Sequence, residues 1–120
     1  MAGVIALVSD LMFGSRIREA AAPFGIAVRS TRSPEALLEA CRAELPTLVF
    51  ADLDDDRVRA LEAVRSLRQD QALQTLTVIG FVSHVDDERA QAARGAGCSR
   101  VLTRGAFVQE LPRLLEAARP

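Results

Sequence analysis

Five short runs of apolar residues divide this sequence, and they alternate with longer segments in which apolar residues recur at helical spacing. Most of the runs are continuously apolar, which is typical of strands that are covered on both faces, as in parallel sheets. They therefore predict five buried strands. The runs are Val4–Val8, Ile26–Val28, Leu48–Ala51, Leu76–Val82 and Val101–Leu102.

The segments that follow these runs predict five helices. Ser33 and Pro34 have the pattern of an N-cap and a first helical position, and Pro23 with Gly25 ends the first helical segment. The fourth helix, expected from Asp86 to Ala96, has only alanines on its apolar face. The apolar positions of the other helices are Phe13, Ile17, Ala20, Ala21 and Phe24; Leu37, Leu38, Cys41 and Leu45; Val58, Leu61, Val64 and Leu67; and Phe107, Val108, Leu111, Leu114, Leu115 and Ala118.

A regular alternation of strand and helix predicts an α/β fold with helices on both faces of one parallel sheet, because crossovers between parallel strands are right-handed. We expect a doubly wound, five-stranded sheet in the order 2-1-3-4-5. The length of 120 residues suits one hydrophobic core, and we see no linker or repeat. The expectation is a single domain over residues 1–120.

Composition and charge narrow the classes of function. The chain is 49% hydrophobic and 26% charged, with a formal net charge of −1. Such a chain lacks the concentrated positive field that binding to nucleic acid or to an acidic membrane requires. We see no signal peptide or membrane-spanning run, and Cys41 and Cys98 lack metal-ligand spacing, so we expect a cytoplasmic protein with reduced cysteines.

Polar residues follow four of the predicted strands. In parallel α/β sheets, ligands bind beyond the carboxyl ends of the strands, so these side chains are expected to share one cleft. Two acids, a hydroxyl and a cation would meet there. The acidic run Asp54–Asp56 is interpreted as a solvated helix start instead. The residues that leave the strands are Ser9 and Asp10, Asp52, Ser83 and His84, and Thr103 and Arg104.

Over essentially its whole length, the chain resembles the receiver domains of bacterial two-component response regulators. The resemblance implies that Asp52, in the stretch Leu48–Leu53, is the phosphate-accepting residue and that Ser83 and Arg104 contact the phosphoryl group. It also implies that Asp10 is the second acid of the family's acidic pair. Asp10 and Asp52 would then be the ligands of a Mg²⁺ ion.

The chain departs from the family pattern at five positions. Ser9 stands in place of the first acid, Arg104 in place of a lysine and Gly105 in place of a proline. His84 replaces a small residue, and Val101 occupies the place of an aromatic residue that moves during activation.

These departures lead to three expectations. The formal charge of the site changes from −2 to −1, so Mg²⁺, a hard cation that prefers carboxylate oxygens, should bind only weakly. The peptide bond between Arg104 and Gly105 should be trans, because a cis bond without proline costs about 2.5–4 kcal/mol. The last helix should begin later than Phe107, since Pro112 removes a helical hydrogen bond.

The leading functional hypothesis is an atypical receiver with impaired phosphorylation, not an enzyme, that acts mainly through contacts with a histidine kinase or a downstream effector. The alternative is a phosphorylatable receiver in which Asp52 accepts a phosphoryl group from a histidine kinase with Mg²⁺. A flavodoxin-like cofactor binder is disfavoured, because Ser9–Gly14 is not a phosphate-binding loop. We expect the fourth helix, fifth strand and fifth helix to form the binding face, with a homodimer as one use of it. Since Val101 replaces the aromatic residue, that contact should not depend on phosphorylation.

Overall fold

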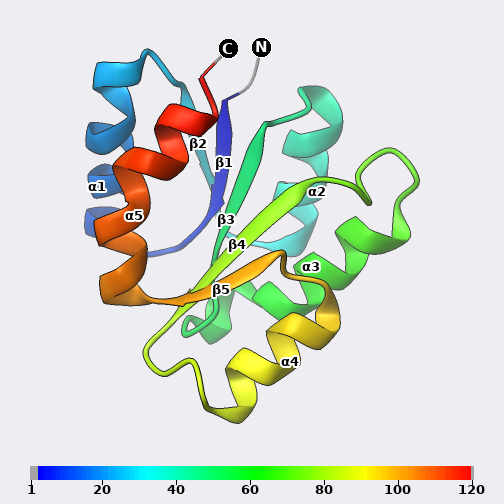
Figure 1. Ribbon diagram of the computed structural model, residues 1–120. Coiled ribbons are helices and arrows are strands. Elements are labelled where there is room, and N and C mark those ends of the chain that lie inside the picture. Colours follow the sequence, from blue (N-terminus) through cyan, green and yellow to red (C-terminus); the bar gives the residue numbers. More distant parts are fainter. Residues whose placement is uncertain (1–2, 120) are drawn as a thin grey trace.

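The computed structural model describes residues 3–119, in which a parallel sheet carries helices on both faces (Figure 1). The strand order is β2-β1-β3-β4-β5, and every neighbouring pair is parallel, which confirms the predicted topology. The strands are β1 (Val4–Leu7), β2 (Val28–Thr31), β3 (Leu48–Asp52), β4 (Thr77–Val82) and β5 (Arg100–Thr103).

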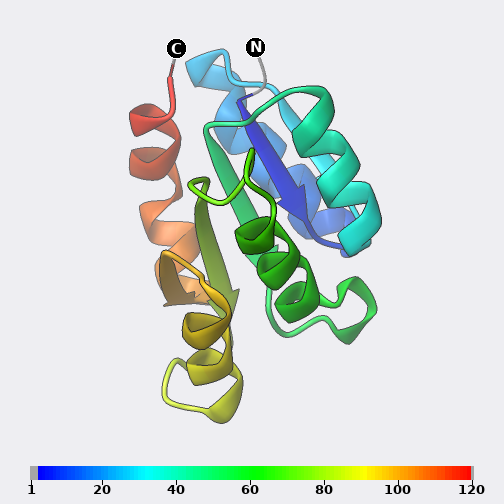
Figure 2. The same ribbon diagram turned by 90° about the vertical axis from the view of Figure 1, so that its right-hand side faces the viewer.

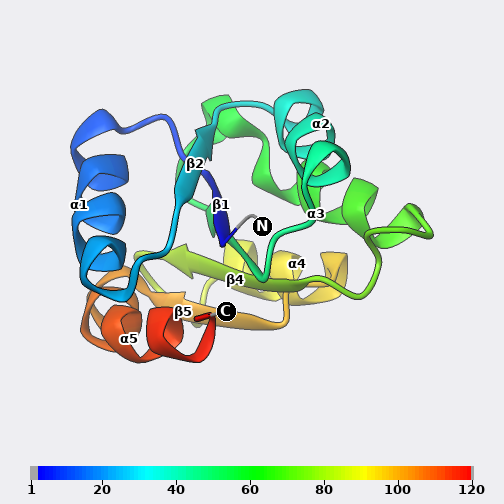
Figure 3. The ribbon, with the colours of Figure 1, turned by 90° about the horizontal axis from the view of Figure 1, so that it is seen from above.

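The helices lie in two layers. Helices α1 and α5 cover one face of the sheet, and α2, α3 and α4 cover the other, as the views in Figures 2 and 3 show. No helix among residues 3–119 is both long and apolar enough to cross a membrane. The elements are α1 (Leu11–Ala21), the 3₁₀ turn η1 (Ala22–Phe24), α2 (Pro34–Ala43), the 3₁₀ turn η2 (Asp56–Val58), α3 (Ala60–Gln69), α4 (Glu88–Ala96) and α5 (Arg104–Ala117).

Two apolar cores follow from the alternation of side chains along the strands. In β1, Ile5 and Leu7 belong to the core beneath α2, α3 and α4, whereas Val4 and Ala6 belong to the core beneath α1 and α5. All four residues of β1 are buried, as the continuously apolar run predicted. The second core is dominated by phenylalanines from β3, β4, α1 and α5.

The second strand lies further along the chain than the sequence predicted. The apolar run Ile26–Val28 contributes only Val28 to β2, which continues through Arg29 and Ser30 to Thr31. β2 is an edge strand that pairs only with β1, so it tolerates exposed polar side chains. The buried Thr31 hydroxyl donates a hydrogen bond to the Ala6 carbonyl oxygen at 3.0 Å.

The start of α5 also differs from the prediction. This helix begins at Arg104, not after Phe107, because the Thr103 side chain accepts a hydrogen bond from the Ala106 N–H and caps the first turn. Pro112 lies inside the helix, which continues past it. The peptide bonds of the described chain are all trans, which confirms the expectation for Arg104–Gly105.

Three further expectations need smaller corrections. Leu45 lies beyond the end of α2 and is exposed, so it is not part of that helix's buried face. Val58 is buried but belongs to η2 rather than to α3. α4 begins at Glu88, two residues after Asp86, with Asp87 as its N-cap. The Ser33 cap is confirmed, since its side chain accepts a hydrogen bond from the Ala36 N–H at 3.1 Å.

Candidate functional site

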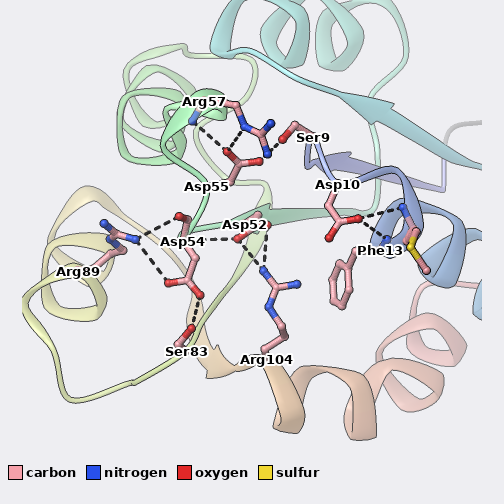
Figure 4. A network of polar contacts seen from close by, with 11 residues as sticks. Ser9, Asp10, Phe13, Asp52, Asp54, Asp55, Arg57, Ser83, Arg89 and Arg104 are labelled. Atoms are coloured by element: carbon pink, nitrogen blue, oxygen red, sulfur yellow. Dashed lines mark hydrogen bonds and ion pairs between the residues drawn. The ribbon is translucent and has the colours of Figure 1, made fainter.

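An open depression lies beyond the carboxyl ends of β1 and β3, where the sequence predicted that polar side chains meet (Figure 4). Its position follows from the topology, because the chain leaves each parallel strand at the same edge of the sheet. The lining residues come from the turn after β1, the end of β3 and its following loop, and the start of α5. They are Asp10, Asp52, Asp54, Asp55, Asp56, Arg57 and Arg104.

Asp52, the last residue of β3, is only 2% exposed. The Arg104 Nη2 atom donates to both of its carboxylate oxygens, at 3.2 Å to Oδ1 and 3.1 Å to Oδ2. The Oδ1 atom also accepts the backbone N–H of Asp54 at 3.1 Å. Both oxygens of the predicted acceptor are therefore already engaged within the chain.

Arg104 lies on an aromatic surface. Its guanidinium carbon is 4.6 Å from the centroid of the Phe13 ring and 5.2 Å from that of the Phe81 ring. Planar guanidinium groups stack on aromatic faces better than the compact, strongly hydrated ammonium of lysine. Two sets of contacts therefore stabilise the position of Arg104, one with the Asp52 carboxylate and one with the two aromatic rings.

The pKa of Asp52 is raised above its ordinary value of 3.8. Burial is the largest cause, because removal from water disfavours the charged carboxylate. The positive charge of Arg104 and the hydrogen bonds from Arg104 and Asp54 act in the opposite direction without cancelling the effect of burial. The ionised Asp52 is thus a cost to the folded state in spite of its partner.

Asp52→Asn is expected to raise the free energy of unfolding at pH 7, because the raised pKa of Asp52 means that its charged form is less favourable in the folded chain than in the unfolded one. A carboxyl whose pKa is raised on folding destabilises the native state above that pKa. As the pH falls through this raised pKa towards 3.8, Asp52 becomes protonated in the native state before it does so in the unfolded state. The difference in free energy of unfolding between the variant and the wild type should therefore shrink.

Urea unfolding at pH 7 and pH 4 tests this expectation. Asp86→Asn is the matched control, since Asp86 is exposed and its replacement should change stability little at either pH. An Asp52→Asn protein that is less stable than the wild type at pH 7 would contradict it.

Asp10 caps α1. Its Oδ1 atom accepts the backbone N–H of Met12 at 2.9 Å and that of Phe13 at 3.1 Å. Asp10 thus serves as a helix cap, whereas the salt bridge with Arg104 forms at Asp52.

The Ser9 hydroxyl donates its hydrogen to Asp55 Oδ2. The other oxygen of Asp55 accepts the backbone N–H of Arg57 at 3.0 Å and its Nε–H at 3.1 Å. Burial raises the pKa of Asp55, but the hydrogen bonds from Ser9 and Arg57 outweigh it and hold the pKa below the ordinary value. The residue that replaces the family's first acid thus fixes a neighbouring carboxylate.

Ser83, the predicted phosphoryl contact, is hydrogen-bonded to an acidic side chain of the loop after β3. Its hydroxyl donates to Asp54 Oδ2 at 2.7 Å. Ser83 and the adjacent His84 are both exposed. Val101 is partly buried and packs against the core beneath α2, α3 and α4.

Sequence reasoning missed Asp54 and Asp55 as members of the site. They were interpreted, with Asp56, as a solvated helix start, and Asp55 does cap η2. The signal that could have found them is the run of three acids directly after a buried strand that ends in Asp52. Of that run, only Asp56 points largely into solvent.

The site fits a hard divalent cation poorly. Within residues 3–119, no group of three or more His, Cys, Asp or Glu side chains is arranged to hold a metal ion. One carboxylate oxygen of Asp10 accepts the hydrogen bonds of the α1 cap, and Asp52 faces the positive charge of Arg104. A cation that prefers several free carboxylate oxygens meets few of them here.

Among known proteins, no family model matches the chain. It is 35% identical over 82 residues to the transcriptional activator protein ExaE of Pseudomonas putida, a match that covers 68% of this chain. The chain spans only 37% of the length of that relative.

Solved structures give the clearest likeness. The chemotaxis response regulator CheY4 of Vibrio cholerae superimposes with a TM-score of 0.83 at 14% identity over 98% of both chains. The receiver domain of NtrX from Brucella abortus gives a TM-score of 0.78 at 18% identity over 96% of both chains. A response regulator in red light signalling of R. palustris gives 0.75 at 21% identity, over 98% of this chain and 90% of that one. The chain therefore has the fold of a response-regulator receiver domain.

Proposed function

We propose that this chain is an atypical receiver domain that acts through contacts with another protein, and in which phosphoryl transfer to Asp52 is impaired. One observation carries the proposal. The Asp52 carboxylate is 2% exposed, and both of its oxygens accept hydrogen bonds from Arg104. In this proposal the domain is a binding module rather than an enzyme, works in the cytoplasm and binds Mg²⁺ weakly.

The chemistry of an acceptor explains why this arrangement is unfavourable. A carboxylate that attacks phosphorus needs an accessible oxygen with a free lone pair along the line of attack. At Asp52 the attacking oxygen would first have to leave Arg104, which is itself held over two aromatic rings. The Ser83 hydroxyl would likewise have to leave Asp54 before it could contact a phosphoryl group.

A second candidate function is a phosphorylatable receiver that takes a phosphoryl group from a histidine kinase. The openness of the site favours it, since the Arg104 side chain is 36% exposed and lines a depression that reaches solvent. If Arg104 turned outward, its guanidinium could bind the oxygens of a phosphoryl group instead of the Asp52 carboxylate, because arginine pairs well with phosphate oxygens.

Intact-mass spectrometry separates the two functions. The protein is incubated with acetyl phosphate and excess Mg²⁺, and the proposal predicts no adduct of one phosphoryl group on the wild type. Arg104→Lys should give a partial adduct, because a flexible ammonium leaves the Asp52 oxygens more accessible. Asp52→Asn serves as the control for the site of modification.

A wild-type adduct that disappears in Asp52→Asn would contradict the proposal and establish the phosphorylatable receiver. An adduct that persists in Asp52→Asn comes from another residue and leaves the proposed impairment of Asp52 standing.

The partner is proposed to be a protein. The relative that shares 35% identity bears the name of a transcriptional activator, so an effector in gene regulation is the class of partner that we favour, with a histidine kinase as the other.

A homodimer across α4, β5 and α5 would have little apolar surface available, because most of the apolar residues at the C-terminal end of the chain belong to the core. Of these residues, Val108 and Leu114 are partly buried, and Phe107, Leu111, Leu115 and Ala118 are buried.

A further inference from the structure

Helix α4 is held to the domain by unusually little apolar surface. Its buried residues are Ala90, Ala93 and Ala96, which have short side chains. The neighbouring helix α3, in contrast, buries Val64 and Leu67. Because apolar stabilisation scales with the area removed from water, polar contacts must account for a large part of what positions α4.

The C-terminal end of α4 is fixed by a dense set of hydrogen bonds. Arg68 of α3 donates from Nε to the Gly97 carbonyl oxygen at 2.9 Å and from Nη1 to that of Leu76 at 2.7 Å. The chain then enters β5 directly, and the Ser99 N–H donates to the Val78 carbonyl oxygen at 2.8 Å. This end of the helix is tied to both α3 and the sheet.

The N-terminal end of α4 depends on one arginine for its polar contacts with the loop after β3. Arg89 Nη1 lies 3.3 Å from the Asp54 carbonyl oxygen and 3.5 Å from Asp54 Oδ1, and Arg89 Nη2 lies 3.5 Å from Asp56 Oδ1. The N-cap Asp87 stabilises the first turn of α4 itself, since its side chain accepts a hydrogen bond from the Ala90 N–H. The Arg89 side chain is 40% exposed, so these contacts are screened and can be broken.

Asp54 connects this arginine to the candidate site. Its backbone N–H donates to Asp52 Oδ1, while its carboxylate contacts Arg89 through Oδ1 and Ser83 through Oδ2 (Figure 4). Asp54 therefore contacts both Asp52 and Arg89, which gives a route of one residue between them. No aromatic side chain at position 101 is needed for this route.

We infer that Arg89 is an ionic latch, formed with Asp54 and Asp56, which holds the N-terminal end of α4 and couples its position to the Asp52 site. When the latch opens, the first turns of α4 move while the end at Gly97 stays anchored through Arg68. The inference goes beyond the proposed function and holds whether or not Asp52 accepts a phosphoryl group.

Hydrogen–deuterium exchange of the full chain, read by mass spectrometry, tests the latch. In Arg89→Gln, the amides of residues 88–92 should exchange about two- to fivefold faster than in the wild type, the range that loss of an exposed ion-pair network supplies. Amides of residues 93–97 should change less. Arg89→Lys, which keeps the charge, should restore part of the protection.

Arg94→Gln is the matched control on the same helix, because the Arg94 guanidinium makes just one hydrogen bond within residues 3–119, to the Val85 carbonyl oxygen at 3.5 Å. It should change the exchange of residues 88–92 less than Arg89→Gln does. Equal exchange in wild type and Arg89→Gln would overturn the latch, and so would a uniform rise that includes β1 and α2. Asp54→Asn gives an independent measurement, in the same direction, if Arg89→Gln folds poorly.

A double variant tests the coupling to the site. Arg104→Met, which removes the charge beside Asp52, should speed exchange in residues 88–92 when Arg89 is present and add little in the Arg89→Gln background. Additive effects, or no effect of Arg104→Met on α4, would overturn the coupling. Neither outcome depends on phosphorylation, so failure here is distinguishable from failure of the proposed function.

Discussion

Phe107→Ala is expected to lower the free energy of unfolding by about 3–5 kcal/mol, the cost of emptying a large buried aromatic site. Phe107 is 0% exposed, and its ring contacts those of Phe50 in β3 and Phe81 in β4. Its centroid is 4.9 Å from that of Phe50, with the rings edge to face, and 4.6 Å from that of Phe81, with the rings stacked. Urea denaturation at pH 7 measures the loss.

Phe24→Ala is the control for this change, since Phe24 is a partly buried phenylalanine at the margin of the same core. It should cost clearly less than Phe107→Ala. Equal losses in the two variants would mean that the aromatic cluster is not the centre of this core. The cluster also bears on the site, because Phe81 and Phe13 support the guanidinium of Arg104.

The double variant Ser9→Asp/Arg104→Lys is expected to bind Mg²⁺ at least about tenfold more tightly than the wild type, a difference of about 1.4 kcal/mol. Ser9 lies against Asp55, so an aspartate there places a further carboxylate beside Asp55 and Asp10. Lysine in place of Arg104 removes the planar fork that contacts both oxygens of Asp52. Isothermal titration calorimetry measures the affinity.

Ser9→Asn/Arg104→Lys is the matched control, because asparagine has the shape of aspartate without its charge. It should gain less affinity than the aspartate variant. Two outcomes would contradict the reasoning: tight binding of Mg²⁺ by the wild type at micromolar concentration, or no difference between the aspartate and asparagine variants.

Much of the fold could be predicted from the sequence, because the signals involved are local. The continuously apolar run at Val4–Val8 predicts a strand covered on both faces, and β1 is buried throughout. Ser33 and Pro34 mark the start of α2 through capping chemistry that needs no distant partner. The parallel topology follows from the alternation of elements and from the handedness of crossovers.

The errors in the predicted fold have one cause, which is that a local sequence pattern does not show which neighbours a strand or helix has in the folded chain. The predicted position of β2 is wrong because an edge strand can consist of polar residues when its other side faces solvent. The start of α5 was misplaced because the penalty assigned to Pro112 ignored the cap from Thr103 and the burial of Phe107, which both favour a helix from Arg104 onwards.

The placement of Asp10, Asp52 and Arg104 at one edge of the sheet follows from the sequence, because the order of strands fixes where the chain emerges from each of them. The partners that these side chains take depend on the tertiary structure. Asp10 caps α1, Ser83 turns to Asp54, and Asp52 pairs with Arg104. Hydrogen bonds and ion pairs act over about 3 Å, a scale that depends on loop conformation and on packing against Phe13 and Phe81 rather than on spacing along the chain.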